Sequence, residues 1–382
     1  MRIVYLSSPD FADCDFPLIK EFQKQGHEVY FFLDLPPYKL KSTLINIKTQ
    51  IKEDSILKAS RYKEFEVYKT YMSMDKVFII NRTKKSMLSP KNLLLYLKFA
   101  YTIKKINPDV INIVAGINLL SSILLLFRKK MVLTVHDPFP HTGEQSLRRE
   151  FFRVLAMKFI PKFILLNEKQ KNKFINQYGI QDNQVFINHL GVYDCISNFI
   201  NKELKTTEDK NVLFFGRISP YKGIEYLLEA MKYVHERIPD ATLTIAGGGK
   251  FYFDVSPYEN LPYIEILNRY IDTSELAMLV NKARIVVCPY TDATQSGVVM
   301  TAYSLCKPVI ATDVGGMRET IIDGKTGILI SPKNSKELAN SMIDLLENEK
   351  KLNDMVEHIK DYFFQQYNWE EIANKYLEIY KS

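Results

Sequence analysis

Gly216-Arg217-Ile218-Ser219-Pro220-Tyr221-Lys222-Gly223 joins a short apolar run to a segment with helical spacing. The apolar run Val212–Phe215 predicts a buried strand, and the apolar positions of 224–231 recur at the spacing of a helix. An arginine and a lysine five positions apart therefore lie where a strand passes into a helix, between two glycines that let the backbone approach a ligand. The helix N-terminus adds free N–H groups and a positive dipole end. This stretch fits a diphosphate site, and it fits equally a surface turn with two solvated basic side chains.

The alternation of strand and helix patterns continues through the chain in two blocks, separated by the polar, turn-rich segment 197–211. Two such blocks in 382 residues predict two doubly wound, Rossmann-like α/β domains with largely parallel sheets. The first is expected over 1–195 and the second over 205–365. Residues 36–76 have ambiguous periodicity and are expected to form helix and loop. The tail after 333 is expected to be nearly all helical.

The two halves of the chain differ in charge. Residues 1–190 carry 30 lysines and arginines against 17 aspartates and glutamates, and the remainder carries 21 against 27. A basic half attracts nucleic acid, acidic lipid surfaces or phosphorylated substrates, although solvated helix faces explain any single cluster. The sequence shows neither basic runs interleaved with aromatics nor a helix-turn-helix pattern, which disfavours nucleic acid as a partner.

The chain is expected to work in the cytoplasm. Its four cysteines are scattered without metal-ligand spacing and fit reduced thiols. Ile3–Leu6 predicts a first strand in place of a signal peptide. The longest apolar stretch, 110–127, contains polar residues that fit a strand and a short helix better than a membrane span. Any membrane contact is therefore expected to be peripheral, at the inner face of the cytoplasmic membrane.

Three further strand ends in the second block carry residues suited to ligand binding. The glycine-rich turn 247–249 follows a strand but does not match the Gly-x-Gly-x-x-Gly pattern of dinucleotide-binding folds. At the next strand end, Thr273 or Ser274 is expected to cap a helix, and the backbone before it is placed to read a base edge. The loop 289–296 leads to a helix that begins at Gly297, where N–H groups suit a phosphate. Ordinary turns and helix caps explain each of these features taken singly.

In combination, the order of these motifs resembles the retaining glycosyltransferases of family 4. The motifs are Gly-Arg-x4-Lys-Gly at 216–223, the glycine-rich turn, Ser-Gly-Val-Val at 296–299 and Lys-Pro-Val-Ile-Ala-Thr-Asp-Val-Gly-Gly at 307–316. The tail 367–373 is similar to the closing helix of that family, so residues from about 366 to 382 are expected to cross back onto the first domain. The resemblance implies a GT-B fold, in which two Rossmann-like domains face a cleft that holds a nucleotide-diphosphate sugar.

The resemblance also implies roles for residues of the second domain. Arg217 and Lys222 would hold the donor diphosphate, and Asp292 would supply a carboxylate that faces the sugar. Thr301 stands where the family usually has a glutamate on the nucleotide ribose, and Ala293 stands where it has a second glutamate eight positions earlier. The other residues expected to bind the donor are Gly216, Gly248, Tyr270, Ile271, Thr294, Gln295, Ser296, Gly297, Val298 and Val299.

The first domain is expected to bind the acceptor. His136 follows a predicted strand, where the family often has an active-site histidine, and is expected to contact the donor sugar or the acceptor. His141 is expected on the acceptor side, since a His-x4-His spacing is poor evidence for a metal site. Asp13 and Asp15 are expected to bind acceptor hydroxyls or to cap the first helix, with capping favoured for Asp15. Gly191 is expected to keep the backbone close to the ligand.

These features predict a retaining, metal-independent glycosyltransferase for surface polysaccharide or glycan biosynthesis. The donor is expected to be a UDP- or GDP-sugar, and the acceptor a saccharide or a polyprenyl-diphosphate-linked saccharide. No metal is expected, because no Asp-x-Asp motif stands at a strand end. Two alternatives stay open. One is a non-catalytic sugar-nucleotide-binding scaffold, motivated by Thr301 and Ala293, and the other is a different GT-B enzyme such as a sugar-nucleotide epimerase, which needs acid/base carboxylates.

Overall fold

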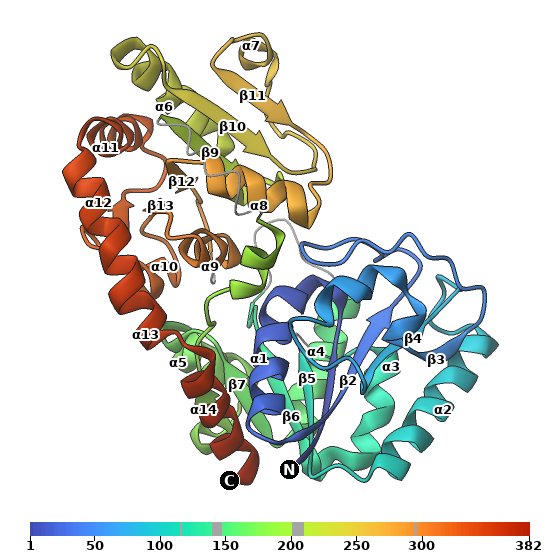
Figure 1. Cartoon of the computed structure of the whole chain (residues 1–382). Coiled ribbons are helices and arrows are strands. Elements are labelled where there is room, and N and C mark those ends of the chain that lie inside the picture. Colours follow the sequence, from blue (N-terminus) through green and yellow to red (C-terminus); the bar gives the residue numbers. More distant parts are fainter. Residues whose placement is uncertain (115–116, 140–146, 201–209, 294–295) are drawn as a thin grey trace. The chain divides into compact units, whose positions relative to one another are not determined.

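The computed structural model describes residues 1–114, 117–139, 147–200, 210–293 and 296–382. These residues form two compact units. The first unit comprises the described residues up to Gly191 together with Trp369–Ser382, and the second comprises the described residues of Val192–Asn368. Each unit contains one sheet with helices packed around it (Figure 1), so both predicted doubly wound domains are confirmed.

The sheet of the first unit has eight strands in the order β3-β4-β2-β1-β5-β6-β7-β8. All neighbours are parallel except β3 and β4, and Tyr5 in the central strand pairs with Phe31 on one side and Asn112 on the other. The strands are β1 Arg2–Ser7, β2 Glu28–Leu35, β3 Ser55–Lys58, β4 Val77–Asn81, β5 Val110–Val114, β6 Met131–Val135, β7 Lys162–Leu165 and β8 Val185–Ile187.

Helices cover this sheet because its strands are apolar on both faces. The residues of β5 and β6 are all buried, and the core continues onto α2 through Leu95, Phe99 and Ile103. The α-helices are α1 Ala12–Lys24, α2 Pro90–Ile106, α3 Leu119–Ser122, α4 Leu147–Phe159, α5 Lys171–Tyr178 and α14 Trp369–Lys381, and the 3-10 helix η4 spans Ile123–Lys130.

The prediction for residues 36–76 was wrong in part. It missed the edge strand β3, and the helical pieces of this region are the short 3-10 segments Ala59–Arg61 and Lys63–Tyr68. No element was predicted for Val77–Asn81, which forms the buried strand β4 beside β2. Strand β3 has only Ile56 and Leu57 as apolar residues, which is too few to indicate a strand. The apolar run 77–80 of β4 is a strand signal that the prediction overlooked.

The sheet of the second unit has six parallel strands in the order β11-β10-β9-β12-β13-β14. The strands are β9 Asn211–Phe215, β10 Thr242–Ala246, β11 Ile264–Leu267, β12 Ile285–Cys288, β13 Val309–Thr312 and β14 Gly327–Ile330. The helices are α6 Ile224–Arg237, α7 Ser256–Glu259, α8 Thr273–Lys282, α9 Gly297–Ser304, α10 Met317–Thr320, α11 Ser335–Glu347, α12 Glu349–His358 and α13 Phe364–Gln366.

Each sheet reverses its strand order at one point. In the first unit β2 and β5 flank β1, and in the second unit β10 and β12 flank β9. The loops that leave two such neighbouring strands turn to opposite faces of the sheet, and ligands bind in the crevice at the carboxyl ends. This topology therefore favours ligand sites at the ends of β1 and β5 in the first unit, and of β9 and β12 in the second.

The last helix, α14, belongs to the first unit, as the resemblance implied. Tyr376 and Tyr380 of α14 pack edge-on or tilted against Phe22 of α1, with ring centroids 6.3 and 6.0 Å apart. Asn188 donates a hydrogen bond of 3.1 Å to the carbonyl of Ile372. The chain thus returns after the second domain to complete the first. Among the helices that the structure describes, none is long and apolar enough to traverse a bilayer.

Candidate functional site

The basic turn of the second unit, defined here as residues 216–223, follows β9 at the point where the strand order reverses. Gly216 has a φ of +117° and donates a hydrogen bond of 2.9 Å to the carbonyl of Ala246. Arg217 is exposed. The Ser219 hydroxyl is buried and has no hydrogen-bond partner among the described residues. A buried hydroxyl in that state fits a missing polar partner such as a ligand.

Gly223 ends the basic turn with a φ of +62°, one residue before α6 begins. A Cβ atom here would lie 2.0 Å from the carbonyl oxygen of Pro289 in the loop after β12. The Thr291 N–H also donates a hydrogen bond of 2.8 Å to the carbonyl of Tyr221. The turn after β9 and the loop after β12 are therefore held against each other, and only glycine fits at their closest point.

Lys222 is the buried cation of the basic turn, with 9% of the residue exposed. Its Nζ lies 3.6 Å from the ring centroid of Tyr290, a residue that is 1% exposed. Such a cation–π contact in a desolvated place is worth about 2 kcal/mol. Burial raises the pKa of Cys288 to about 11, although nearby Lys222 lowers it. The Cys288 thiol is thus neutral at pH 7, beside the positive charge of Lys222.

Helix α9 approaches the basic turn from the loop after β12. A Cβ atom at Gly216 would lie 3.7 Å from Cγ2 of Val298, in the first turn of α9. Ser296 is buried, and its hydroxyl lies 3.5 Å from that of Tyr290. Gly297 is the first residue of α9, as predicted. The start of α9 therefore lies beside the turn that carries Arg217 and Lys222.

Asp292 and Thr301, which are expected near the donor sugar and the ribose, differ in exposure. Asp292 is half-buried in the loop after β12, so it remains reachable from solvent. Thr301 is 3% exposed inside α9, and Val299 is fully buried. Ala293 lies under Gly315, where a Cβ atom would approach the carbonyl oxygen of Ala293 to 1.5 Å. Thr294 and Gln295 lie outside the described residues.

The glycine-rich turn and the segment after β11 lie beside the basic turn. Ile218 donates a hydrogen bond of 3.1 Å to the carbonyl of Gly248. A Cβ atom at Gly248 would lie 3.7 Å from the backbone nitrogen of Tyr270. Tyr270 and Ile271 are half-buried, and burial raises the pKa of Tyr270 to about 12. The structure thus brings the predicted base-side segment next to the predicted diphosphate turn.

The predicted cap of α8 was wrong. The N-cap is Asp272, whose side chain accepts a hydrogen bond of 3.0 Å from the Glu275 N–H. Thr273 is the first helical residue. Aspartate is at least as good an N-cap as threonine or serine, so the sequence contained the correct cap one position earlier. Arg269 forms a bidentate ion pair with Glu275, at 2.7 and 2.5 Å, which ties the loop to the helix.

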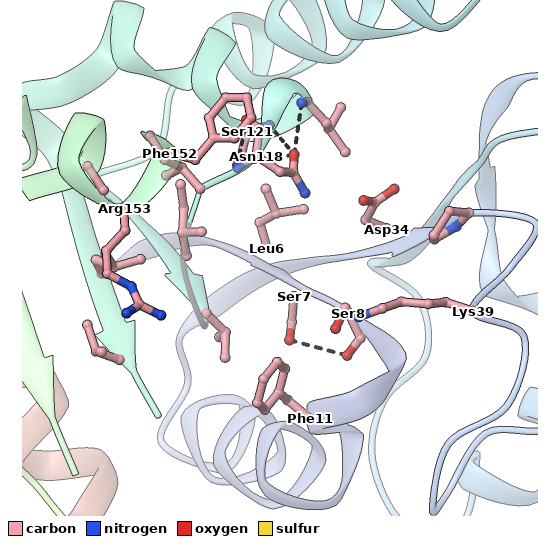
Figure 2. A pocket seen from close by; sticks show the side chains of 18 of the residues that line it. Leu6, Ser7, Ser8, Phe11, Asp34, Lys39, Asn118, Ser121, Phe152 and Arg153 are labelled. Atoms are coloured by element: carbon pink, nitrogen blue, oxygen red, sulfur yellow. Dashed lines mark hydrogen bonds between the residues drawn. The ribbon is translucent and has the colours of Figure 1, made fainter. Parts of the chain in front are cut away.

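A pocket of about 490 Å³ lies at the reversal point of the first unit. Figure 2 shows the side chains of Leu6, Asp34 and Asn118 around the same space. Arg82 forms a buried bidentate ion pair with Asp34, with both bonds at 2.9 Å. Burial raises the pKa of Asp34, while Arg82 opposes that change. Much of the remaining wall is apolar, and it includes Phe11, Ile113, Ile117, Leu133, Phe152 and Met157.

The sequence analysis did not identify this pocket. Asp34 follows the apolar run 31–33 near the carboxyl end of β2, and Arg82 directly follows the carboxyl end of β4. A charged residue in that position of a parallel strand is a usable signal for a ligand site. It was missed for Arg82 because β4 itself was not predicted.

His136 follows β6 and lies next to a wall of this pocket. Its ring packs at a tilt against that of Phe11, which lines the pocket, with centroids 4.4 Å apart. Its Nε2 atom lies 3.9 Å from the Cys14 sulfur. Burial lowers the pKa of His136 to about 4, although Asp137 raises it. The imidazole is therefore neutral at pH 7 and suited to accept or donate a hydrogen bond. His141 lies outside the described residues.

Asp13 and Asp15, which were also predicted on the acceptor side, differ in burial. Asp15 is not a cap, because Phe11 is the N-cap of α1 and Asp15 is fully buried inside the helix. Asp15 accepts a hydrogen bond of 2.8 Å from Tyr5, and burial raises its pKa to about 8. Such complete enclosure does not suit contact with acceptor hydroxyls. Asp13 is half-buried in the first turn, and burial raises its pKa to about 7.

The structure assigns Gly191 to the packing of the last helix. A Cβ atom at Gly191 would lie 2.5 Å from Cε2 of Trp369, at the start of α14. The indole therefore occupies the space that a side chain at this position would need. The prediction placed the glycine close to a ligand, whereas its immediate neighbour is this tryptophan.

Parts of this chain are similar in sequence to known proteins. Residues 196–362 match the sequence profile of glycosyl transferases group 1. An uncharacterized glycosyltransferase of Methanocaldococcus jannaschii is 28% identical over 255 residues, which cover 65% of this chain and 68% of that protein. A D-inositol 3-phosphate glycosyltransferase of Corynebacterium aurimucosum is 31% identical over 180 residues, which cover 45% of this chain and 42% of that protein.

The fold extends over the whole length of a solved structure. The crystal structure of Anabaena HepE in complex with UDP-glucose has a TM-score of 0.70 and 18% identity, covering 99% of this chain and 98% of that one. This likeness identifies the fold as that of the GT-B glycosyltransferases. Residues 196–362 thus carry the sequence pattern of the glycosyl transferases group 1.

Proposed function

We propose that this protein transfers a sugar, with retention of configuration, from a nucleotide-diphosphate sugar to a saccharide or a lipid-linked saccharide. The observation that carries the proposal is the basic turn of the second unit. There, the turn that carries Arg217 and the desolvated Lys222 leads into α6 and lies beside the start of α9, where the strand order reverses. Cations and helix N-termini at a reversal point suit a diphosphate. UDP- and GDP-sugars are the proposed donors.

The proposed chemistry uses this positive charge at the leaving group. The bond between the anomeric carbon and the phosphate oxygen breaks, and the diphosphate departs with growing negative charge. Arg217 and Lys222 bind that charge more strongly in the transition state than in the ground state, which accelerates the reaction. Fixed cations in these positions supply the stabilisation that a divalent metal gives in other enzymes, so we propose transfer without a metal.

Retention follows in this proposal from attack on the face that the leaving group vacates. The acceptor hydroxyl forms the new bond to the anomeric carbon, and its proton passes to the departing phosphate oxygen. Asp292, which solvent reaches, is the proposed carboxylate facing the sugar, and Thr301 the proposed contact to the ribose. A neutral threonine in place of a charged glutamate weakens such a contact by about 1 kcal/mol.

The pocket of the first unit is the proposed acceptor site. Its apolar wall and its buried ion pair Asp34–Arg82 suit an acceptor with both an apolar and a hydroxyl-bearing part. His136, neutral at pH 7 and in contact with the pocket residue Phe11, is proposed to bond a hydroxyl of the donor sugar or the acceptor. The proposed location is the cytoplasm or the inner face of the cytoplasmic membrane, in glycan or surface polysaccharide biosynthesis.

A donor screen tests the proposal. Thermal shift with UDP-, GDP- and ADP-sugars identifies the donor, and product analysis then distinguishes transfer, epimerisation and binding alone. Arg217→Ala and Lys222→Ala are expected to abolish turnover of the identified donor. Near-wild-type rates in both variants would rule out the donor site, and an epimerised donor without transfer would assign the chain to a different reaction.

A further inference from the structure

The outward face of α2 is apolar along its centre. Leu94, Leu97 and Tyr101 are 67%, 60% and 58% exposed. They stand three and four residues apart, so they form one line on the helix, here called the α2 stripe. The opposite face of α2 is buried in the core of the first unit. Helix α2 is therefore apolar on its inner face, which packs into the core, and apolar again along the centre of its exposed outer face.

Two further leucines are exposed on segments that adjoin α2. Leu88 is 71% exposed just before α2 begins, and Leu126 is 76% exposed on η4. Helix α2 packs against both η4 and β3 and runs along the outside of the first unit (Figure 1). Single exposed leucines need no explanation, but a group on adjacent elements marks an interaction surface.

Positive charge borders the α2 stripe on both sides. Helix α2 carries Lys91, Lys98, Lys104 and Lys105 and no aspartate or glutamate. The Lys105 ammonium lies 4.8 Å from the ring centroid of Tyr101, which keeps it beside the stripe. The end of η4 adds Arg128, Lys129 and Lys130, all exposed. An apolar line between basic side chains is the composition of helices that lie in the plane of a membrane interface.

The charge also selects among the partners that such a surface fits. A second copy of the chain docked through the same face would bring lysines against lysines, which costs free energy. An anionic lipid surface fits both the apolar and the basic side chains, because leucines enter the acyl boundary while lysines contact the headgroups. Charge complementarity thus favours a membrane over a dimer.

We propose that the first unit docks on an anionic lipid membrane through Leu88, the α2 stripe, Leu126 and the flanking lysines. The surface begins next to the pocket along the chain, since Met87 lines the pocket and Leu88 directly follows it. Docking there holds the pocket near lipid-linked acceptors, a consequence that rests on the proposed function. The docking itself does not depend on the reaction.

Vesicle binding of the full chain tests the docking. We expect cosedimentation with vesicles of phosphatidylcholine and phosphatidylglycerol that falls with added salt, and weak binding to pure phosphatidylcholine. Lys104→Gln with Lys105→Gln should weaken binding about 10- to 30-fold, and Leu94→Ser with Leu97→Ser about tenfold or more. The matched control is Lys336→Gln with Lys350→Gln, two exposed lysines of the second unit, which should leave binding unchanged.

Two results would overturn the docking surface. One is anionic vesicle binding that the α2 variants leave at the wild-type level. The other is a wild-type chain that sediments as a dimer and becomes monomeric with Leu94→Ser and Leu97→Ser, since the face would then join two copies. Hydrolysis of a soluble donor sugar serves as the separate readout. We expect the α2 variants to retain it, whereas failure of the donor site removes it without affecting vesicle binding.

Discussion

The close approach at Gly223 sets a measurable requirement on the second unit. Alanine at position 223 lowers the free energy of unfolding in two ways. Its φ of +62° is left-handed, which costs an L-residue about 1–2 kcal/mol. Its Cβ would also lie 2.0 Å from the Pro289 carbonyl oxygen, so the backbone must move, and such overpacking typically costs about 1–3 kcal/mol. Gly223→Ala is therefore expected to destabilise the second unit by about 2–5 kcal/mol.

Gly324→Ala is the matched control for this prediction. Gly324 also has a left-handed φ, +73°, but a Cβ there would meet nothing within 4 Å. Only the backbone term applies, so the loss should be about 1–2 kcal/mol. Urea denaturation followed by circular dichroism compares the two variants through their midpoints. Nucleotide binding should weaken in Gly223→Ala, because Lys222 moves with the turn, and stay unchanged in Gly324→Ala. Equal midpoints and equal binding in the two variants would show that the Pro289 carbonyl places no requirement on residue 223.

Two more predictions concern the first unit. Because burial raises the pKa of Asp15 from its ordinary 3.8 to about 8, the unfolded chain releases this proton first, and stability is lost as pH rises between those values. Asp15→Asn should therefore raise the free energy of unfolding relative to wild type increasingly from pH 4 to 8, by on the order of 1 kcal/mol or more. Thermal midpoints measured across this range should rise in parallel, and a gain independent of pH contradicts this. Gly191→Ala should displace Trp369, the single tryptophan, shift its emission to the red and cost about 1–3 kcal/mol. An unchanged spectrum would show that the indole does not rest on Gly191.

The sequence predicted most of the second unit because its motifs stand at strand ends, where local pattern and chemistry coincide. The helix after Gly223 and the helix at Gly297 begin where expected. The sequence could not reveal that Tyr290 supports Lys222, since the contact joins residues 68 positions apart. The burial of Thr301 likewise depends on how α9 packs, not on its local sequence.

The first unit was predicted less well, for a physical reason. Its pocket is formed by side chains from at least four strand ends, among them Asp34 and Leu133, and such convergence follows from topology more than from any local motif. Asp15 shows the limit of local rules. An aspartate early in a helix favours a cap, yet tertiary packing encloses this one beside Tyr5. The exposure of the α2 stripe could not be predicted either, because α2 has apolar residues on both faces and only packing decides which face is buried.

Calorimetric titration with UDP and GDP measures whether Arg217 and Lys222 hold the diphosphate of a nucleotide. Arg217→Gln removes a charge from an exposed site, and Lys222→Met keeps the apolar length beside Tyr290. Arg237→Gln, at the far end of α6 and paired with Glu347, is the control. Each of the first two variants is predicted to lower the affinity for the nucleotide that binds at least about tenfold, with the control unchanged. Wild-type affinity in both Arg217→Gln and Lys222→Met would contradict the account.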